Sequence, residues 1–383
     1  MKAIAIGLML PLGVLAAPFA TFPEGCVTPD GMVVDAADRL VVAAANFADT
    51  TKPGALYRID NPGDRPYKWI DLPVNPATGR CSPMGIAYGD DGALYVVDNQ
   101  PWTGESLTKN QGRLLRLEFK GDRLSAWHVV AEGMEHPNGV KFHRGRIYLT
   151  QSSLSSIKDA SGLLVSGVYR FDPKERNVKV KNARTDRNLL FTVTTKNKFC
   201  QYGLDGLAFD AEGRLYVGNF GDGEVSRVVF DAKGRLYVGN FGDGELFRVV
   251  LDGTGGVASI ASFAKSHFDI ARDPAKPGFL QYATTCPMRT TDGMCFGPDG
   301  WLYVADFSNN AIAKVSPDGT RVAFVQRDED GKWMEGKMNQ PGEPIFWRGR
   351  LVVSNFDAVA GTPDKTNAKT DRPATLSELP YAP

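Results

Sequence analysis

The chain has 383 residues, which is longer than an ordinary single domain. A repeat architecture can be this long, because each unit packs only against its neighbours. Hydrophobic residues make up 43%, aromatic residues 10%, and glycine is abundant, a composition that suits strands joined by tight turns. Lys+Arg and Asp+Glu each total 44, so the basic excess of a nucleic-acid surface is missing and nucleic acid is excluded as a partner.

The first twenty residues predict a secretory signal peptide. A basic start at Lys2 is followed by an apolar run through Leu15 that ends in small residues, and the run is too short for a membrane helix. We therefore assign residues 1–20 to a signal peptide and expect a periplasmic or secreted protein that is free of the membrane after processing. The alternative is that residues 14–22 supply a strand that closes the fold.

One unit recurs six times along the chain: a residue followed by glycine, a short apolar run, a turn and a second apolar run. The second run starts eight positions after the glycine in five copies, for example from position 31 to 39, and seven positions after it in the third copy, from 139 to 146. Turns such as 90–92 (Asp-Asp-Gly) favour β-hairpins. Strong hairpins at this spacing predict an all-β protein, a six-bladed β-propeller over residues 21–356.

Two segments depart from the regular repeat. Residues 209–229 recur almost verbatim as residues 230–250, which is too short for a full blade, so we expect a duplicated hairpin that enlarges the fourth blade. A seventh blade is the alternative. Residues 357–383 form a polar C-terminal tail, in which residues 375–381 resemble a strand that could take part in blade closure.

The innermost strand of each propeller blade runs along the central axis, so the residues before the six glycines should lie at one height. These residues are Asp30, Met84, Asn138, Asp205, Asp292 and Pro341. Three carboxylates at one height repel one another unless a cation compensates, and calcium above all takes oxygen donors of this kind. The pattern predicts a divalent cation bound by Asp30, Asn138, Asp205 and Asp292. For any single step, the alternative is an ordinary Asp-Gly or Asn-Gly turn.

A second column of residues ends the second strand of each hairpin: Ala44, Asp98, Gln151, Asn219, Asp306 and Asn355. These side chains either reach the substrate or hydrogen-bond the metal ligands, or they cap the loops that follow them. His136 lies two residues before Asn138 and is a candidate base at the tunnel mouth, with a solvated loop histidine as the alternative.

Four cysteines each precede an inner strand by a few residues, so disulfides between adjacent blades are plausible. The candidate pairs are Cys26 with Cys81 and Cys200 with Cys286. The fifth, Cys295, lies inside an apolar strand and is predicted to be an inert buried thiol.

Residues 29–356 resemble the senescence-marker-protein and gluconolactonase-like family, which includes diisopropylfluorophosphatase-type enzymes. The most specific segments are residues 136–139, 204–209 and 291–296. The resemblance implies a six-bladed propeller with an axial calcium, whose ligands fall by position on Asp30, Asn138, Asp205 and Asp292. Two of these depart from the family pattern, with Asp30 in place of the usual Glu and Asp205 where Asn is common.

The sequence therefore predicts a calcium-dependent hydrolase of a small lactone or ester. In this prediction the cation polarises the carbonyl, Asp292 is the base or nucleophile and Asp205 is its reserve. Two other functions stay open: a non-catalytic binding propeller, and a propeller lyase or synthase in which His136 would matter more. Metal dependence separates the first of these from a hydrolase.

Overall fold

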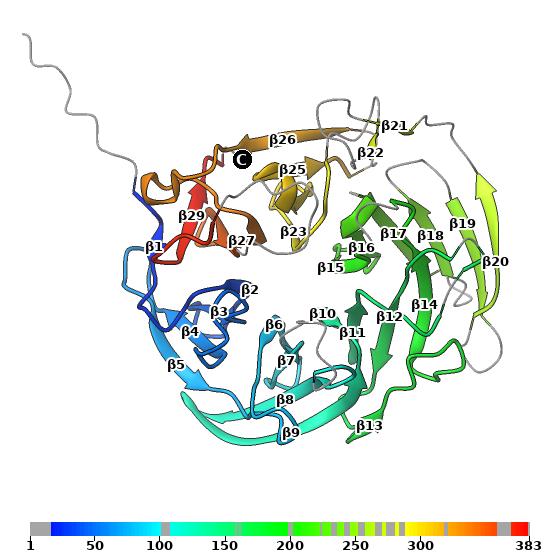
Figure 1. The fold of residues 1–383 in the computed structure, drawn as a ribbon, viewed down its shortest axis with the longest axis horizontal. Coiled ribbons are helices and arrows are strands. Elements are labelled where there is room, and N and C mark those ends of the chain that lie inside the picture. The colour runs from blue at the N-terminus through cyan, green and yellow to red at the C-terminus, as the bar shows by residue number, and fades with distance from the viewer. Residues whose placement is uncertain are drawn as a thin grey trace, which may run out of the picture.

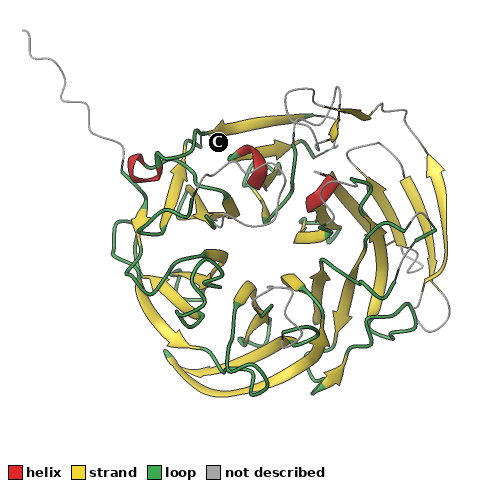
Figure 2. Ribbon diagram, viewed as in Figure 1, coloured by secondary structure: helices red, strands yellow, loops and turns green. Residues whose placement is uncertain are grey.

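The computed structural model describes most of the chain. The described residues are 17–100, 108–157, 159–160, 162–197, 202–222, 224–230, 236–240, 246–251, 257–264, 270–272, 280–282, 288–317, 321–357 and 369–381, and between 224 and 282 only the side chain of Val225 is described. Strands dominate the described chain, and its helices are three short 3-10 turns, η1 (Phe220–Asp222), η2 (Phe307–Asn309) and η3 (Trp333–Glu335) (Figure 2). None of the described helices is long and apolar enough to cross a membrane.

The strands form sheets around a central axis (Figure 1). The first sheet contains β2 (Pro29–Val34), β3 (Leu40–Ala44), β4 (Ala55–Ile59) and β5 (Tyr67–Asp71). The second contains β6 (Pro83–Tyr88), β7 (Leu94–Asp98), β8 (Gly112–Lys120), β9 (Arg123–Met134) and β13 (Val178–Lys179). The third contains β10 (Pro137–His143), β11 (Arg146–Gln151), β12 (Val165–Phe171) and β14 (Leu189–Thr194).

The remaining sheets complete the circle. Six strands follow in one sheet: β15 (Leu204–Phe209), β16 (Leu215–Asn219), β17 (Glu224–Phe230), β18 (Leu236–Asn240), β19 (Leu246–Leu251) and β20 (Val257–Ala264). A two-stranded ribbon, β21 (Ile270–Arg272) and β22 (Leu280–Tyr282), precedes β23 (Met294–Phe296), β24 (Leu302–Asp306), β25 (Ala311–Val315) and β26 (Val322–Arg327). The last sheet contains β27 (Pro341–Trp347), β28 (Arg350–Asn355), β29 (Thr375–Leu379) and β1 (Ala20–Thr21).

The all-β propeller predicted from the repeat is confirmed, whereas the blade count is not. Five blades of four or five strands are described in full rather than six, because most side chains of the six-stranded sheet β15–β20 lie outside the described residues. The duplicated hairpin falls in this sheet, where β16, β17, β18 and β19 pair antiparallel in sequence order. That this sheet is one enlarged fourth blade stays a prediction.

The predicted hairpins form as expected from their turn residues. In the turn between β6 and β7, the Asp91 carboxylate accepts hydrogen bonds from the Ala93 backbone N–H (3.1 Å) and the Tyr95 hydroxyl (2.9 Å). Gly92 has a φ of +75°, a conformation that glycine adopts without the cost paid by other residues. The turn before β24 repeats this arrangement with Asp299 as the acceptor.

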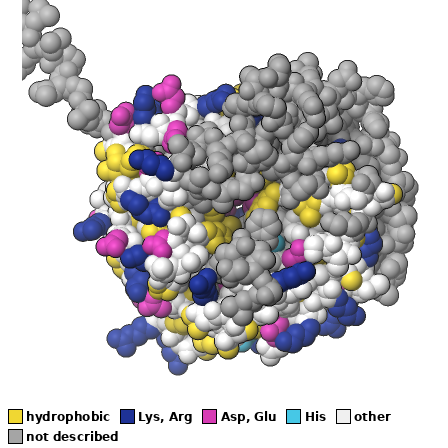
Figure 3. Space-filling model, in the orientation of Figure 1, with side chains coloured by type: hydrophobic (Ala, Val, Ile, Leu, Met, Phe, Trp, Pro, Cys, Tyr) yellow, Lys and Arg dark blue, Asp and Glu magenta, His cyan; other side chains and the backbone are white. Residues whose placement is uncertain are grey.

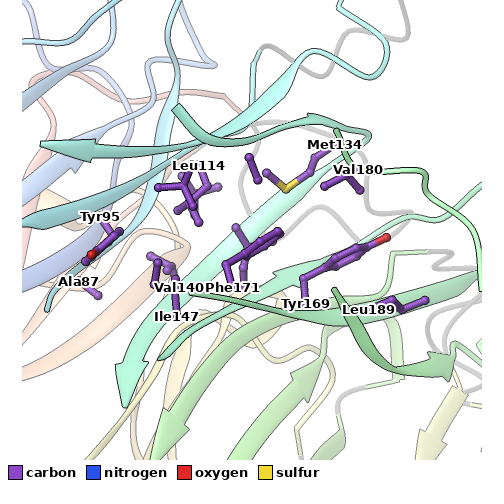
Figure 4. Close-up of a cluster of buried hydrophobic side chains, with 14 of the residues drawn as sticks. Ala87, Tyr95, Leu114, Met134, Val140, Ile147, Tyr169, Phe171, Val180 and Leu189 are labelled. Carbon is purple, nitrogen blue, oxygen red and sulfur yellow. The ribbon is translucent and has the colours of Figure 1, made fainter. Parts of the chain in front are cut away.

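The hydrophobic core is divided among the spaces between sheets. Six apolar clusters each lie between two neighbouring sheets, so every sheet is covered on both faces. In the cluster between the second and third sheets, Tyr95 and Leu114 face Val140, Ile147 and Tyr169 across the gap (Figure 4). Packing of this kind holds the inner strands in a fixed register along the axis.

The ring is closed by the two ends of the described chain. Strand β1 pairs antiparallel with β29, with Ala20 opposite Leu376. The backbone N–H groups of Phe19 and Phe22 extend this pairing by donating to Leu376 and Ala374. The N-terminal segment therefore supplies a strand of the last sheet, which is the alternative considered for residues 14–22, while residues 1–16 lie outside the described chain.

Candidate active site on the central axis

A β-bulge recurs at the step that contains the glycine of the repeat in five of the six inner strands. The pairing of each inner strand with its neighbour shifts register at this step in five sheets, for example between Pro29 and Met32 in β2. A bulge leaves its extra residue outside the ladder and re-aims that side chain. The Asp-Gly and Asn-Gly steps at positions 30, 138 and 205 therefore lie within strands β2, β10 and β15, and the alternative interpretation as turns is wrong for them.

The glycines are required by the close approach of neighbouring inner strands. A Cβ atom on Gly31 would lie 2.4 Å from the Met84 carbonyl oxygen, and one on Gly206 would lie 2.4 Å from the Asp292 carbonyl oxygen. The same conflict recurs around the ring, ending with Gly342, whose Cβ would lie 2.8 Å from Asp30 Oδ1. Each glycine thus lets one blade contact the site residue of the next.

This close packing brings the predicted metal ligands around one cavity. Asp30, Asn138, Asp205 and Asp292 all line it, together with Glu343. The cavity measures about 20 Å³, room for an ion or a water molecule. Met84 and Pro341, the column residues without an oxygen-bearing side chain, are not among its lining residues.

The three aspartates at this cavity are buried and resist ionisation. Burial raises the pKa of Asp30, Asp205 and Asp292, that of Asp205 to about 8, and mutual repulsion among the carboxylates raises those of Asp30 and Asp292 further. Asp205 and Asp292 share a hydrogen bond that favours the charged form of Asp205 and the neutral form of Asp292. At neutral pH and without a cation, the raised pKa values therefore favour the protonated form of both carboxyls, and of the two Asp292 holds its proton more tightly.

Two charged residues that the sequence analysis missed cross the tunnel beside the aspartates. Lys141 Nζ on β10 lies 2.8 Å from Glu343 Oε1 on β27, and Glu343 Oε2 accepts the Met32 backbone N–H at 2.7 Å. Lys141 and Glu343 are the only charged residues among the six inner strands apart from the column itself and the strand end at His143. That signal was available in the sequence once the inner strands were known.

His136 lies beside the site and is enclosed by protein. It is 3% exposed, its Nε2 is hydrogen-bonded to the Tyr202 hydroxyl, and burial lowers the pKa of His136 to about 3. The Tyr202 hydroxyl also accepts a hydrogen bond from Asn138 Nδ2 at 3.2 Å. The solvated loop histidine considered from sequence is therefore wrong, and Tyr202 is a site neighbour that no repeat pattern marked.

The second column caps loops instead of reaching the axis. The Asp98 carboxylate accepts the Ser82 backbone N–H at 2.8 Å, and Asn355 accepts the Asn339 N–H at 3.0 Å. Gln151 and Asp306 make the equivalent bonds to the segments before β10 and β23. These side chains orient the backbone that leads into each inner strand, so they cap loops as the alternative predicted, but the loops in these bonds precede the hairpin instead of following it.

The disulfide predicted between Cys26 and Cys81 is absent, and both thiols are free and buried. They pack on opposite faces of the first sheet, Cys26 in the cluster toward the last sheet and Cys81 in the cluster toward the second. Cys200 and Cys286 lie outside the described residues. Cys295 is free and half-buried, and burial raises the pKa of its thiol, which fits an unreactive side chain.

No ready-made metal cage exists in the part of the chain that the structure describes. There, no group of three or more acidic, histidine or cysteine side chains is arranged to hold a metal ion. The donors of the predicted site line one cavity, and the hydrogen bond between Asp205 and Asp292 uses carboxyl oxygens that a cation would otherwise bind.

Comparisons with known proteins place the fold. No family model and no curated protein matches the chain. The chain is similar to the PQQ-bound aldose sugar dehydrogenase of Streptomyces coelicolor, with 16% identity, coverage of 94% of this chain and 96% of that chain, and a TM-score of 0.50. A putative gluconolactonase shares 15% identity over 90% of each chain with a TM-score of 0.48. A gluconolactonase from Xanthomonas campestris shares 14% identity over 94% of this chain and 88% of that one, with a TM-score of 0.46.

These identities bear on the fold alone. Proteins described as gluconolactonases are thus among the structural neighbours of this chain, at low sequence identity and without a matching family model.

Proposed function

We propose that this protein is a metal-dependent hydrolase of a small lactone or ester, with calcium as the cation. The observation that carries the proposal is the excess of buried carboxylates on the axis. Asp30, Asp205, Asp292 and Glu343 line one cavity, and Lys141 offers a single positive charge against them. A cluster of this composition is costly to ionise unless further positive charge binds there.

The donor set fits a hard divalent cation by its chemistry. Asp30, Asp205 and Asp292 would supply carboxylate oxygens and Asn138 an amide oxygen, the ligand types that calcium takes, with water in the remaining positions. Binding has to open the hydrogen bond between Asp205 and Asp292 and release its proton. A bound cation would polarise the substrate carbonyl and stabilise the oxyanion that forms there.

The protein's own groups would then carry the proton transfers. Once ionised, Asp292 is the base that removes a proton from the attacking water, or the nucleophile, with Asp205 as its reserve. Lys141 neutralises Glu343 and so limits the negative charge that an incoming water or substrate meets. The Tyr202 hydroxyl holds His136 and Asn138 in place beside the cluster.

Two competing functions are supported less well. A lyase or synthase would use His136 as its base, but the pKa of His136 is lowered to about 3, which makes this imidazole a weak base at neutral pH. A non-catalytic binding propeller has no need for three buried aspartates on its axis. The names of the similar structures include a dehydrogenase and hydrolases, so the fold does not choose among activities, and the proposal rests on the site.

Three further proposals accompany this function. We propose that β15–β20 is a fourth blade enlarged by the duplicated hairpin, which makes six blades in all. We also propose that the chain carries an N-terminal signal peptide that is cleaved before Phe19, two residues earlier than the sequence predicted, because Phe19 and Ala20 pair with the last sheet. The mature protein would then be periplasmic or secreted and act on a small molecule.

Calorimetry on the chelated protein tests the proposed function. Calcium is titrated into the wild type, Asp292→Asn and the control Asp90→Asn, which changes an exposed turn residue in the same way. We expect one site in the wild type and the control, weakened in Asp292→Asn, and lactone hydrolysis that stops when calcium is chelated. A wild type that binds no divalent cation would remove the proposal and leave the binding propeller ahead.

A further inference from the structure

Five aromatic rings form a continuous run over the tunnel, here called the aromatic arc. Its members are Tyr202, Phe220, Phe307, Phe356 and Phe47. Successive ring centroids lie 5.1, 5.6, 5.9 and 6.1 Å apart, each within the range of ring-to-ring contact. The run extends from the fourth sheet through the last sheet to the first. Tyr202, Phe356 and Phe47 are only half-buried, so the arc keeps accessible surface.

The arc borders the candidate active site at two places. At one end, the Tyr202 hydroxyl accepts a hydrogen bond from Asn138 Nδ2 at 3.2 Å. On the last sheet, a Cβ atom on Gly342 would lie 3.6 Å from the Phe356 Cβ and 2.8 Å from Asp30 Oδ1. A molecule whose reacting carbonyl lies at the aspartates would therefore have its substituents within reach of these rings.

The repeat explains why the arc covers only part of the mouth. Phe220, Phe307 and Phe356 each follow the capping residue of their sheet directly. The residues at this position in the other three sheets are small or polar: Ala45, Asn99 and Ser152. Three neighbouring sheets thus carry an aromatic residue at this position, and the other three carry a small or polar one. The view down the axis shows a hollow near the centre with hydrophobic atoms on its walls (Figure 3).

Asn99 adds a hydrogen-bonding group at this position in the second sheet. Its side chain is buried, with 2% of the residue exposed, and neither its amide nitrogen nor its amide oxygen has a hydrogen-bond partner in the described chain. An amide left unpaired in this way costs free energy in the folded protein unless a ligand or water satisfies it.

We infer that the aromatic arc binds a hydrocarbon or aryl substituent of the substrate, and that Asn99 binds a polar group on it. This inference rests on the proposed function and narrows it to esters or lactones with an apolar side chain. A polyhydroxylated lactone would leave the rings in contact with hydroxyl groups, whereas each methylene buried against them contributes about 0.8 kcal/mol, or roughly fourfold in kcat/KM.

A homologous series tests the inference. Hydrolysis of γ-lactones with alkyl side chains from methyl to hexyl is measured with calcium present, beside gluconolactone. In the wild type, kcat/KM is expected to rise about fourfold per methylene until the arc is covered, and gluconolactone is expected to be the poorest substrate. In Phe356→Leu, which changes a half-buried ring of the arc, the ratio of the hexyl to the methyl substrate falls several-fold. Phe119→Leu, which alters a ring stacked on Trp69 in another part of the molecule, keeps the wild-type ratio.

A binding experiment separates this inference from the proposed function. The non-hydrolysable probes are cyclopentanone and 2-hexylcyclopentanone, whose affinities are measured by ligand-observed NMR on folded wild type and Phe356→Leu. If the hexyl ketone binds more tightly than the parent ketone, and Phe356→Leu reduces the difference, the arc binds apolar groups even if no lactone is hydrolysed. Equal affinities for the two ketones in the wild type, or a rate independent of chain length, would overturn the inference.

Discussion

The buried aspartates predict an unusual dependence of stability on pH. Burial raises the pKa of Asp205 to about 8 in the folded protein, against 3.8 for an ordinary Asp. A carboxyl with a raised pKa holds its proton more tightly when folded, so protonation stabilises the fold. The stabilisation is complete below pH about 4 and is lost progressively as the pH rises toward 8, provided that no cation is bound.

The expected magnitude follows from proton linkage. Where the unfolded chain has lost the proton and the folded chain keeps it, the free energy of unfolding falls by about 1.4 kcal/mol per pH unit for each such carboxyl. Between pH 5 and pH 7 one carboxyl contributes about 2.7 kcal/mol, or roughly 3 to 4 °C in Tm for a chain of this length. Asp30 and Asp292, whose pKa values are also raised, act in the same direction.

Thermal unfolding in chelator, from pH 5 to pH 8, measures this effect. The wild type is expected to lose more Tm over this range than Asp205→Asn, because the variant has no carboxyl at that position. Saturating calcium should remove most of the wild-type loss, since the cation replaces the proton. Identical pH profiles for the wild type and Asp205→Asn in chelator would refute the reasoning, because the aspartate would then titrate as an exposed group does.

Three other perturbations follow from contacts described above. Lys141→Met removes the charged partner of Glu343, so the free energy of unfolding should fall by about 2 kcal/mol. Because the site becomes more negative, calorimetry should show tighter calcium binding, and an unchanged calcium affinity would count against an electrostatic role for Lys141. Asn99→Leu replaces an unpaired buried amide, so the free energy of unfolding should rise by about 1 kcal/mol while kcat/KM falls. A decrease in both stability and kcat/KM would indicate a structural role for Asn99. Removing residues 1–17 should leave Tm unchanged, whereas removing residues 1–22 deletes β1 and should lower it; equal Tm values would refute a closing role for β1.

The fold was largely predictable because its signal is local and repeated. Spacing within each hairpin and turn residues such as Asp91 and Gly92 determine the strands without knowledge of the rest of the chain. The gathering of Asp30, Asp205 and Asp292 at one cavity follows from the same repeat. Their roles as ligands or base stay predictions.

What the sequence could not supply depends on which sheets face one another. The pairing of Lys141 with Glu343 spans 202 positions and exists only once the ring has closed. Cys26 and Cys81 precede neighbouring inner strands in the same way, and only the packing places them on opposite faces of one sheet. The aromatic arc was missed because three of its members, Phe220, Phe307 and Phe356, come directly after capping residues, at positions that the sequence analysis assigned to loops.

The short strand that closes the ring makes the site depend on both ends of the chain. Ala20 and Leu376 are separated by 356 positions (376 − 20). Pairing such distant segments costs conformational entropy, and this cost is offset only when the contacts of the whole circle have formed. Asp30 lies on the first sheet and Glu343 on the last, on either side of this seam. An opened circle would move these two acids apart, so cation binding should report whether the N-terminal strand is in place. A fragment lacking either end should lose the site even though every proposed ligand is still present in it.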